Sequence, residues 1–546
     1  MDHMRLILAL VLSFIIFMAW NALFGPQSGP KPPAAERPAQ ESAAAPPQVA
    51  PAPPSLEEPL PAAREEITSR TLIVDTPLYQ ARFRENAAAI ESFILKRYRT
   101  RPEKDAPAMD LLPGKEGLAV TAVGLVKAAA LAEGAKGFQA ELAGERLDLT
   151  EGDGELIFRS RALPGLEIEK IYRFRADRYL IELEVHFVNR TEKPFADSPW
   201  IALQNEFPPH RGSSAFEGPS ALIDRSLEQI PLGDIAKKSR VSGLVKWLAL
   251  ENRYFMAALV PVEPEAAEIA LRRLAGNGVE ARYAAPPRSF EPGVPVKISF
   301  ELFFGPKSLQ VVRTAGRELE RIVDFGFFDW LAKPCLWILN FFYSLVPNYG
   351  VAIIILTVLT KILLWPLGTK SYKSMNQMKK LQPLLQEIRN RYKNDRKKMN
   401  EEIMRLHRTY NINPLGGCLP MLVQIPVFFA LYRMLDQAIE LRHAAFFGWI
   451  NDLSAPDRLG NFDFAIPLME PPYGIPVLTL VMGATMLWQQ KMTPTTGDPT
   501  QAKLMMLMPA FFTFIFINFS SGLVLYWLVN NVLSIGQQYY IQKKFG

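Results

Sequence analysis

The chain has 546 residues and a mass of 61.4 kDa, which is too long for a single compact domain of about 150 residues. Apolar runs crowd the first 24 residues and the last 200, whereas residues 65–325 have the composition of a soluble domain. This segregation excludes an ordinary cytosolic enzyme and predicts a polytopic α-helical membrane protein with a large extramembranous insert. The net charge of +6 lies in loops beside apolar runs, which favours lipid head groups or a ribosome as partners over a specific nucleic-acid sequence.

The N-terminus begins with an apolar stretch at residues 6–24, which would span about 28 Å as a helix. We predict residues 1–25 to be a transmembrane anchor with a cytoplasmic N-terminus. A cleaved signal peptide is the alternative, but Trp20 and Leu23 crowd the exit where cleavage needs small residues. Residues 26–64 follow as a Pro/Ala-rich linker, too poor in apolar side chains to fold. A plain spacer is favoured there over a binding tract.

The next segment alternates with a period of two, as in Ile181, Leu183, Val185 and Phe187. It predicts an antiparallel β-sandwich over residues 65–324, closed by a short helix or two between residues 308 and 323. No motif for nucleophilic, metal or phosphate chemistry occurs in the sequence. We therefore expect no cofactor, no metal and no catalytic residue. The insert is interpreted as a chaperone or docking module, and a glycan-binding role stays open.

Beyond the insert, residues 325–346 are aromatic and amphipathic, which predicts a helix in the outer membrane interface. Three spans are predicted at residues 349–367, 415–432 and 474–489. The apolar stretch 504–541 would be about 57 Å of helix, so residues 518–522 are expected to turn it into a two-span hairpin. With the anchor, six spans result. Five of them form a core at 347–541, followed by a tail at 542–546.

Loop charges orient these spans. Residues 369–413 carry 12 Lys/Arg against 4 Asp/Glu, whereas residues 438–473 carry 2 against 5. The positive-inside rule places the first loop in the cytoplasm, and counting spans then places both termini there. The β-sandwich lies outside the cytoplasm in this topology. Cys335 and Cys418 fall on opposite faces, which excludes a disulfide within the chain.

The basic loop 369–413 repeats apolar residues at helical spacing on both sides of Asn394-Asp395, which predicts two antiparallel helices. We interpret this cytoplasmic hairpin as a docking element for a ribosome or an emerging chain. An ordinary positive-inside loop is the alternative. The basic residues singled out in the hairpin are Lys379, Lys380, Arg389, Arg391, Arg396 and Lys397.

Lys361 is the sharpest feature of the spans, because a cation within the membrane costs a few kcal/mol and usually faces protein or water. Snorkelling to the cytoplasmic head groups is the alternative. Neighbouring spans carry polar groups at membrane depth without a central carboxylate, which leaves Lys361 free for an incoming anionic group. The predicted 474–488 and 504–519 helices are shorter than a ~30 Å core, which favours local thinning of the bilayer. The polar groups are Thr357, Thr360, Gln424, Thr485, Asn530, Asn531 and Ser534.

Four motifs resemble the YidC-type membrane protein insertases over residues 349–541, and the order of anchor, linker, β-domain and five further spans resembles the Gram-negative form over the whole chain. The motifs are Asn413-Pro414-Leu415-Gly416-Gly417-Cys418-Leu419-Pro420, Gln424-Ile425-Pro426, Gln490-Lys491-Met492-Thr493-Pro494 and Ser521-Gly522-Leu523-Val524-Leu525-Tyr526-Trp527.

The resemblance implies a bacterial inner-membrane protein whose β-domain is a periplasmic β-supersandwich. It further implies a hydrophilic groove open to cytoplasm and lipid, and cooperation with the Sec translocon. It also implies a single basic residue in the groove, commonly Arg. Lys361 takes that position, set by Trp365-Pro366-Leu367, and keeps the charge without the planar fork of Arg. The resemblance places Thr357, Gln424, Tyr526 and Trp527 at groove or core positions.

The resulting hypothesis is a non-covalent insertase and chaperone for nascent inner-membrane proteins, working alone or with the Sec translocon. A transporter or channel is the main alternative, although repeated halves and charged pore rings are missing from the sequence. A passive folding chaperone is the closest alternative, because it would leave insertion rates unchanged. A membrane protease is weaker, since no histidine lies within a predicted span to act as a base.

Overall fold

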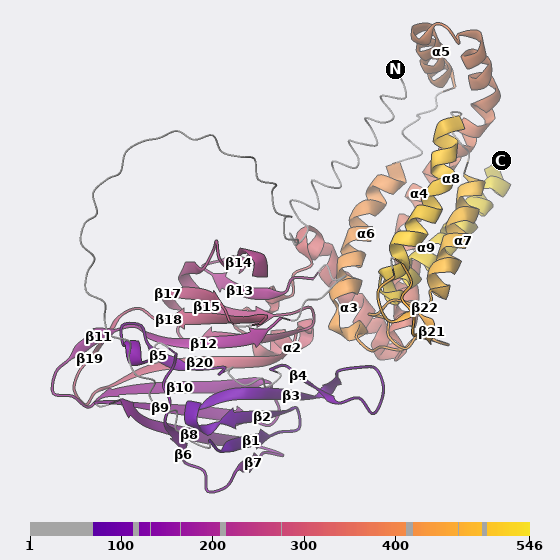
Figure 1. Cartoon of the computed structure of the whole chain (residues 1–546). Helices are drawn as coiled ribbons and strands as arrows, with labels where there is room; N and C mark the ends of the chain where they lie inside the picture. The colour runs from indigo at the N-terminus through magenta and orange to yellow at the C-terminus, as the bar shows by residue number, and fades with distance from the viewer. Residues whose placement is uncertain are drawn as a thin grey trace, which may run out of the picture.

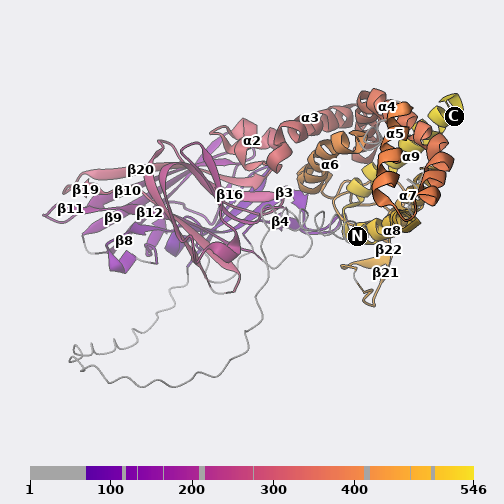
Figure 2. The ribbon, with the colours of Figure 1, turned by 90° about the horizontal axis from the view of Figure 1, so that it is seen from above.

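The computed structural model describes residues 69–112, 119–131, 133–163, 165–207, 215–274, 276–410, 419–467, 469–493 and 499–545. Strands gather in one body and helices in another, which we call the β-domain and the helical core (Figure 1). Helices α2 and α3 lie at the transition between them (Figure 2). The predicted anchor and linker and Cys418 lie outside the described residues.

The β-domain runs from Thr71 to Pro306 and contains the strands that the sequence predicts. The first half comprises β1 (Thr71–Asp75), β2 (Tyr79–Arg84), β3 (Ala89–Arg99), β4 (Ala108–Asp110), β5 (Val123–Leu125), β6 (Phe138–Ala140), β7 (Arg146–Asp148), β8 (Asp153–Leu163), β9 (Leu166–Arg175) and β10 (Leu180–Asn189). The second half comprises β11 (Phe195–Asp197), β12 (Pro199–Glu206), β13 (Gly218–Ile223), β14 (Ser226–Gln229), β15 (Arg240–Glu251), β16 (Phe255–Pro261), β17 (Glu265–Arg273), β18 (Gly278–Ala284), β19 (Arg288–Phe290) and β20 (Pro295–Pro306).

Strand β10 confirms the predicted alternation, because Ile181, Leu183, Val185 and Phe187 are all buried. It pairs antiparallel with β9 on one side and β20 on the other. Among the described residues, β1 with β7 is the parallel pair between named strands, and the other named strands pair antiparallel. The predicted antiparallel class therefore holds with one exception.

Two sheets pack face to face. The smaller has the order β4-β3-β2-β1-β7, and the larger follows β5-β12-β18-β17-β15-β16-β20-β10-β9-β8-β6 with β13 and β14 beside it. Aromatic rings join them: Phe83 of β2 meets Tyr172 of β9 at 4.9 Å between centroids, and Phe93 of β3 stacks on Phe304 of β20 at 4.9 Å. These contacts define a β-sandwich, as predicted.

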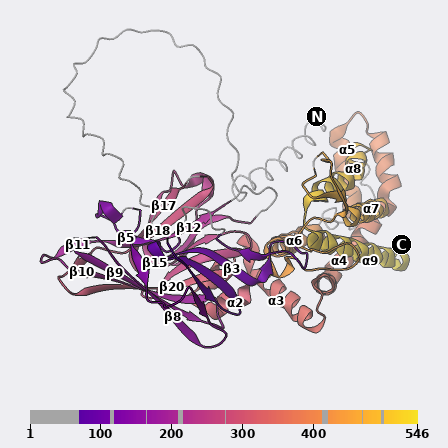
Figure 3. The ribbon, with the colours of Figure 1, turned by 60° about the horizontal axis from the view of Figure 1, so that its bottom comes forward.

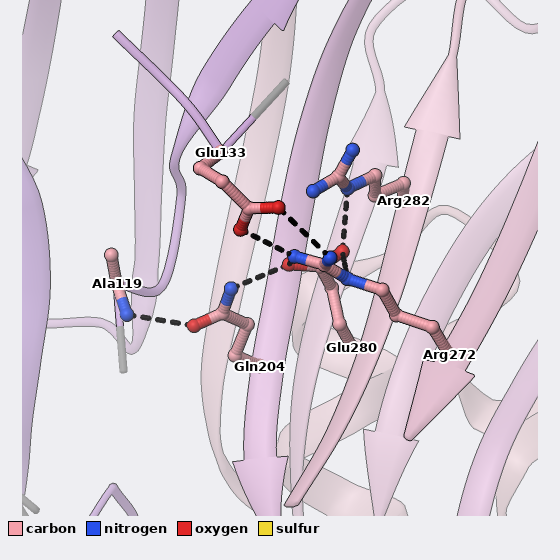
Figure 4. A network of polar contacts seen from close by, with 6 residues as sticks. All are labelled: Ala119, Glu133, Gln204, Arg272, Glu280 and Arg282. Atoms are coloured by element: carbon pink, nitrogen blue, oxygen red, sulfur yellow. Dashed lines mark hydrogen bonds and ion pairs between the residues drawn. The ribbon is translucent and has the colours of Figure 1, made fainter. Parts of the chain in front are cut away.

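A buried carboxylate organises one part of the larger sheet (Figure 4). Glu280 of β18 is 1% exposed and accepts hydrogen bonds from Arg272 at 2.6 Å, Arg282 at 2.5 Å and Gln204 at 2.6 Å. Arg272 also pairs with Glu133 at 2.9 Å. The buried charge of Glu280 is thus neutralised within the sheet, because both of its carboxylate oxygens accept hydrogen bonds.

Short helices close the β-domain, as predicted for residues 308–323. They are α2 (Leu309–Ala315) and a 3-10 turn at Leu319–Ile322. Helix α3 (Asp329–Leu345) follows within the predicted amphipathic segment. It buries Cys335, Leu336 and Leu339, and it leaves Trp330 and Trp337 exposed at 69% and 65%. These two faces suit a helix that lies between protein and lipid.

The helical core corrects several predicted boundaries. Hydropathy marks where apolar side chains end, whereas backbone hydrogen bonding decides where a helix ends. The predicted span 349–367 therefore continues as one 43-residue helix into the basic segment. The helices are α4 (Tyr349–Arg391), α5 (Arg396–Thr409), α6 (Leu419–Gln437), α7 (Val477–Met492), α8 (Pro499–Ile515) and α9 (Ser521–Phe545).

Three further helix ends differ from the predicted ones. Helix α6 continues past the predicted end at 432 to Gln437. Helix α7 begins at Val477 rather than 474, because Gly474 lies in β22 (Tyr473–Ile475), which pairs with β21 (Leu459–Phe462). Helix α9 extends to Phe545, so the predicted separate tail at 542–546 is helical as far as the structure describes it.

The expected break in the last apolar stretch is confirmed. Helix α8 ends at Ile515, a 3-10 turn covers Phe516–Asn518, and α9 begins at Ser521. Within the described part of the chain, α4 is the helix that has both the length and the apolar composition to cross a membrane, while the apolar segment Met505–Asn518 is shorter. The count of six spans stays a prediction.

The basic segment forms the predicted pair of helices. Leu381 and Leu385 of α4 are buried and pack with Ile403 and Leu406 of α5. The Asp395 side chain accepts a hydrogen bond from the Lys398 backbone amide at 3.1 Å and caps α5. We call residues 369–409 the basic hairpin. It lies at the end of the core far from the β21–β22 pair, and the C-terminus lies toward the same end (Figure 1).

Candidate substrate site in the helical core

Lys361 makes its contact across two helices. Its Nζ donates to the Ser534 hydroxyl of α9 at 2.6 Å, and that hydroxyl donates to the Asn530 carbonyl at 2.7 Å. In the part of the chain that the structure describes, Lys361 forms no ion pair with a carboxylate. Its charge therefore meets a neutral partner, unlike the buried carboxylate of Glu280 in the β-domain.

A third helix joins the same group. Gln424 of α6 donates through Nε2 to Asn530 Oδ1 at 3.2 Å, and its side chain also hydrogen-bonds with the Tyr526 hydroxyl. We call Lys361, Gln424, Tyr526, Asn530 and Ser534 the polar cluster. It links α4, α6 and α9 by hydrogen bonds to uncharged acceptors, which can be exchanged for those of another polar molecule.

The sequence of α9 explains why the cluster lies on one face. Asn530, Ser534 and Gln537 recur at intervals of four and three residues, so they form one stripe along the helix. Gln537 donates to the Trp365 carbonyl of α4 at 3.0 Å. A Cβ at Gly368 would lie 2.9 Å from Gln537 Nε2, so this glycine lets the two helices approach closely.

Two predicted site residues lie outside the cluster. Thr357 is buried, and its hydroxyl donates to the Ile353 carbonyl of its own helix at 2.7 Å. Trp527 faces aromatic rings instead of polar groups, with Phe428 at 4.8 Å and Phe516 at 5.0 Å between centroids. Both are packing residues in this structure.

Trp527 belongs to a group of rings that stands beside the polar cluster. Tyr432 lies 6.1 Å from Phe428 and 5.8 Å from Phe519, and Phe516 lies 4.8 Å from Phe519. We call Phe428, Tyr432, Phe516, Phe519 and Trp527 the aromatic cluster. On α6, Phe428 and Tyr432 are four and eight positions beyond Gln424, so these two rings lie about 6 and 12 Å beyond Gln424 along that helix.

The predicted basic residues of the hairpin have different surroundings. Lys379, Lys380 and Lys397 are exposed. Arg391 is also exposed and lies 3.7 Å from Glu387, whereas Arg389 is half-buried. The side chain of Arg396 lies outside the described residues. These charges form a solvated surface and no enclosed site.

The structure brings two further residues to the cluster, one of which the sequence analysis named only as a polar group and one of which it missed. Ser534 was visible as a polar residue at membrane depth, and its spacing from Asn530 would have placed it on the same face. Tyr372 hydrogen-bonds with Ser534 and Gln489, but it follows the predicted end of its span, so hydropathy gave no indication of it.

Family models match both bodies of the chain. Residues 71–338 match the YidC periplasmic domain, and residues 341–546 match the 60Kd inner membrane protein family. The chain is 39% identical over 558 residues to a membrane protein insertase YidC of Syntrophus aciditrophicus, with 99% of each chain covered. It is 40% identical over 548 residues to the protein of the same name in Pelobacter propionicus, again with 99% of each covered.

A crystal structure of an active YidC insertase, 18% identical, aligns with 86% of this chain and 95% of its own, with a TM-score of 0.36. This low score adds nothing to the assignment, which rests on the sequence matches.

The β-sandwich and the helical core thus define an inner-membrane protein with a periplasmic domain. The chain belongs to the YidC family of membrane protein insertases. Its relatives are named for inserting proteins into the membrane and not for catalysing a reaction, so nascent membrane proteins and the lipid bilayer are its partners.

Proposed function

We propose that the polar cluster holds the hydrophilic flank of a nascent membrane protein while the apolar helix of that client leaves along the lipid-facing helices. The observation that carries this proposal is the Lys361 ammonium, whose described partner is a neutral hydroxyl. An acidic flank would offer the ammonium a carboxylate in place of the neutral hydroxyl, so that the hydrogen bond would become an ion pair as well. The cluster and its surroundings would then form a hydrophilic groove with one positive charge.

The surface around the cluster supports an exit toward lipid. Ile362 and Leu363, directly after Lys361, are 61% and 78% exposed. On α8, Leu507 and Phe511 are 64% and 56% exposed. Large apolar side chains in contact with solvent are unfavourable, so these faces suit the hydrocarbon of a bilayer. A client helix would meet the same faces as it leaves.

Helix lengths support a thinned bilayer at this place. Helix α7 has 16 residues and α8 has 17, which give about 24 and 26 Å. Both are below the ~30 Å of a typical hydrocarbon core. A thinner bilayer shortens the path of a polar flank and lowers its transfer cost.

We further propose the topology that the charge pattern predicts, with six spans, cytoplasmic termini and a periplasmic β-domain. Three features support it: the basic hairpin and the C-terminus share one end of the core, β21 and β22 lie at the other end, and α3 has an aromatic exposed face (Figure 1). In this topology the hairpin receives the chain from the ribosome. The Sec translocon would cooperate with the insertase for larger clients.

The test is insertion of a short single-span client with an acidic translocated tail into proteoliposomes that contain the full chain. Lys361→Ala is expected to slow insertion about tenfold, which corresponds to the loss of roughly 1.4 kcal/mol. Lys361→Arg is expected to retain it. Lys370→Ala, which removes an exposed lysine from the same helix, is the control. Equal insertion by Lys361→Ala and wild type would contradict the proposal and favour snorkelling.

A further inference from the structure

A cavity lies where the β-domain meets the helical core. Its volume is about 690 Å³, within the range of cavities that bind ligands. The β-domain contributes the ends of β4 and β12 and the turn between β15 and β16. The core contributes the end of α6, parts of the segment 442–472 that follows α6, and the turn before α9. We call it the junction cavity. Strand β3 lies toward α6 in two views (Figures 2 and 3).

An ion pair holds the two walls together. Arg253, in the β15–β16 turn, donates to Asp436 Oδ1 at 2.9 Å and through Nε to the Asp436 carbonyl at 2.7 Å. Asp436 lies in the last turn of α6. Both side chains are largely buried, at 19% and 13% exposed, so the cavity belongs to a defined junction.

The junction cavity and the polar cluster share two helices. Tyr432 of α6 and Phe519, just before α9, line the cavity and also belong to the aromatic cluster. On the other side of those rings lie Gln424 and Asn530 of the polar cluster. A polar segment that passes the aromatic cluster from Lys361 along α6 and α9 would therefore arrive in this cavity.

Arg442 provides a cation on the core side of the cavity. Its guanidinium lies over the rings of Phe255 and Tyr254, at 5.3 and 5.8 Å from their centroids, and donates to the Arg99 carbonyl at 2.7 Å. Among the described residues no carboxylate forms an ion pair with Arg442, although Asp452 lies near enough to influence it. Two aromatic faces position the guanidinium and leave most of its five N–H donors for another acceptor.

The other charged residues that line the cavity indicate which class of ligand it would bind. The carboxylates of Asp110, Glu206, Glu217 and Glu470 line other parts of the cavity, beside the Arg253–Asp436 ion pair, so its walls carry both signs of charge. A nucleic acid carries a negative charge at every nucleotide and would meet these carboxylates wherever it lay, whereas a polypeptide can place a single carboxylate against Arg442. A polypeptide offers carboxylates, amides and apolar side chains together, which matches a cavity lined by Arg442, carboxylates and aromatic rings.

We propose that the junction cavity receives the translocated flank of the client, with Arg442 pairing to a carboxylate of that flank. This inference rests on the proposed function, since it continues the route that begins at Lys361. It adds Arg442 as a second cation on this route, at the periplasmic end of the helical core. The β-domain is then part of the substrate path, because it supplies one wall of the cavity.

The test is photocrosslinking during insertion of the single-span client with an acidic tail. A photoreactive amino acid replaces Met109, on the β-domain wall of the cavity, in the full chain in proteoliposomes. The control replaces Val294, which is 55% exposed in the turn between β19 and β20. Position 109 is expected to crosslink to the client tail, and position 294 is not.

Charge dependence is the second part of the test. Arg442→Gln is expected to lower the crosslink from position 109 to an acidic tail about tenfold, while Arg442→Lys retains it and a neutral tail is unaffected. If insertion still depends on Lys361 but position 109 gives no more crosslink than position 294, the cavity proposal is overturned and the proposed function stands. If insertion does not depend on Lys361, the proposed function fails independently of the crosslink.

Discussion

The β-domain and the helical core each contain a lysine in an apolar part of the molecule, and the surroundings of the two amines differ. Lys170 of the β-domain is fully buried, and it donates to the carbonyls of Ala88 and Thr121 at 2.5 and 2.7 Å. Burial lowers the pKa of Lys170 well below its usual range, so the β-domain favours the neutral amine. In the helical core, Lys361 is half-buried and meets a hydroxyl. Of these two amines only Lys361 is partly exposed, as an exchangeable anionic partner requires.

The β-domain and the polar cluster also differ in whether they contain buried carboxylates with charged partners. In the β-domain, Glu280 is held by two arginines, and Glu251 is fully buried beside Lys307 at 2.5 Å. The described contacts of the polar cluster involve hydroxyl, amide and carbonyl groups. A folded domain gains stability when its charges are matched internally, whereas a substrate site must leave part of its polarity for the substrate. The β-domain is therefore expected to be sensitive to the loss of internal partners, and the core to the charge of its client.

The largest effect on stability is expected at Glu280. Replacing it by alanine removes the shared acceptor of Arg272 and Arg282 and leaves Arg282 nearly buried beside Trp200. We expect a loss of about 3 kcal/mol in the free energy of unfolding of the β-domain. Urea unfolding of the full chain in detergent, followed by tryptophan fluorescence, measures it.

The matched control is Glu155→Ala, which breaks an exposed pair with Arg173 in the same domain. It is expected to change the free energy of unfolding by about 0.5 kcal/mol or less. Equal losses for Glu280→Ala and Glu155→Ala would show that burial of the network contributes nothing.

The second-largest loss of stability is expected at the junction between the two regions. Arg253→Ala removes the donor to Asp436 and leaves that carboxylate partly buried at the junction. A loss of about 2 kcal/mol is expected in the opening of the junction, because the hydrogen bonds are charge-assisted. Faster hydrogen exchange in β16 and at the end of α6 would report it. Arg240→Ala, which breaks an exposed pair with Glu268, should leave exchange there unchanged.

Packing within the core gives a smaller effect. A Cβ at Gly483 of α7 would lie 2.1 Å from Thr513 Oγ1 of α8, so Gly483→Ala forces the two helices apart. We expect it to cost about 1 to 2 kcal/mol, measured by thermal unfolding in detergent. Gly536→Ala in α9 meets nothing within 4 Å and is expected to stabilise the helix by up to about 1 kcal/mol. The same sign for both variants would contradict this packing.

The smallest effect is a pH dependence of the junction. Glu440 lies just after α6, and burial raises its pKa, opposed by hydrogen bonds from Ser308 and Asn340. Because the folded state favours the neutral acid, junction stability is highest below the ordinary pKa of 4.5 and falls as the pH rises through the raised value. Glu440→Gln should remove this slope, as followed by hydrogen exchange between pH 4 and 8. An unchanged slope would assign the dependence to another group.

The sequence predicted some features of the two regions and not others. Alternation in β10 and helical spacing in the basic hairpin are local patterns, and both appear in the structure. The length of α4 was not predictable from hydropathy, because its backbone continues through Pro366 after the apolar side chains give way to polar ones. Strand order was also out of reach, since residues distant in the chain pair across the sheets.

The candidate site was predictable in its residues but not in its contacts. Lys361, Gln424 and Asn530 stood out as polar groups at membrane depth. Lys361 and Ser534 are 173 positions apart, so their hydrogen bond depends on how α4 packs against α9. The junction cavity had no sequence indication, because both bodies supply its walls from separated segments.

The most direct test of the charge role of Lys361 is a charge exchange between insertase and client. Clients with acidic, neutral and basic translocated tails are inserted by wild type, Lys361→Ala and Lys361→Glu, and the initial rates are compared. Wild type is expected to prefer the acidic tail, Lys361→Ala to lose that preference, and Lys361→Glu to favour the basic tail. If the order of the three tails is the same in all three proteins, Lys361 does not recognise the client by charge.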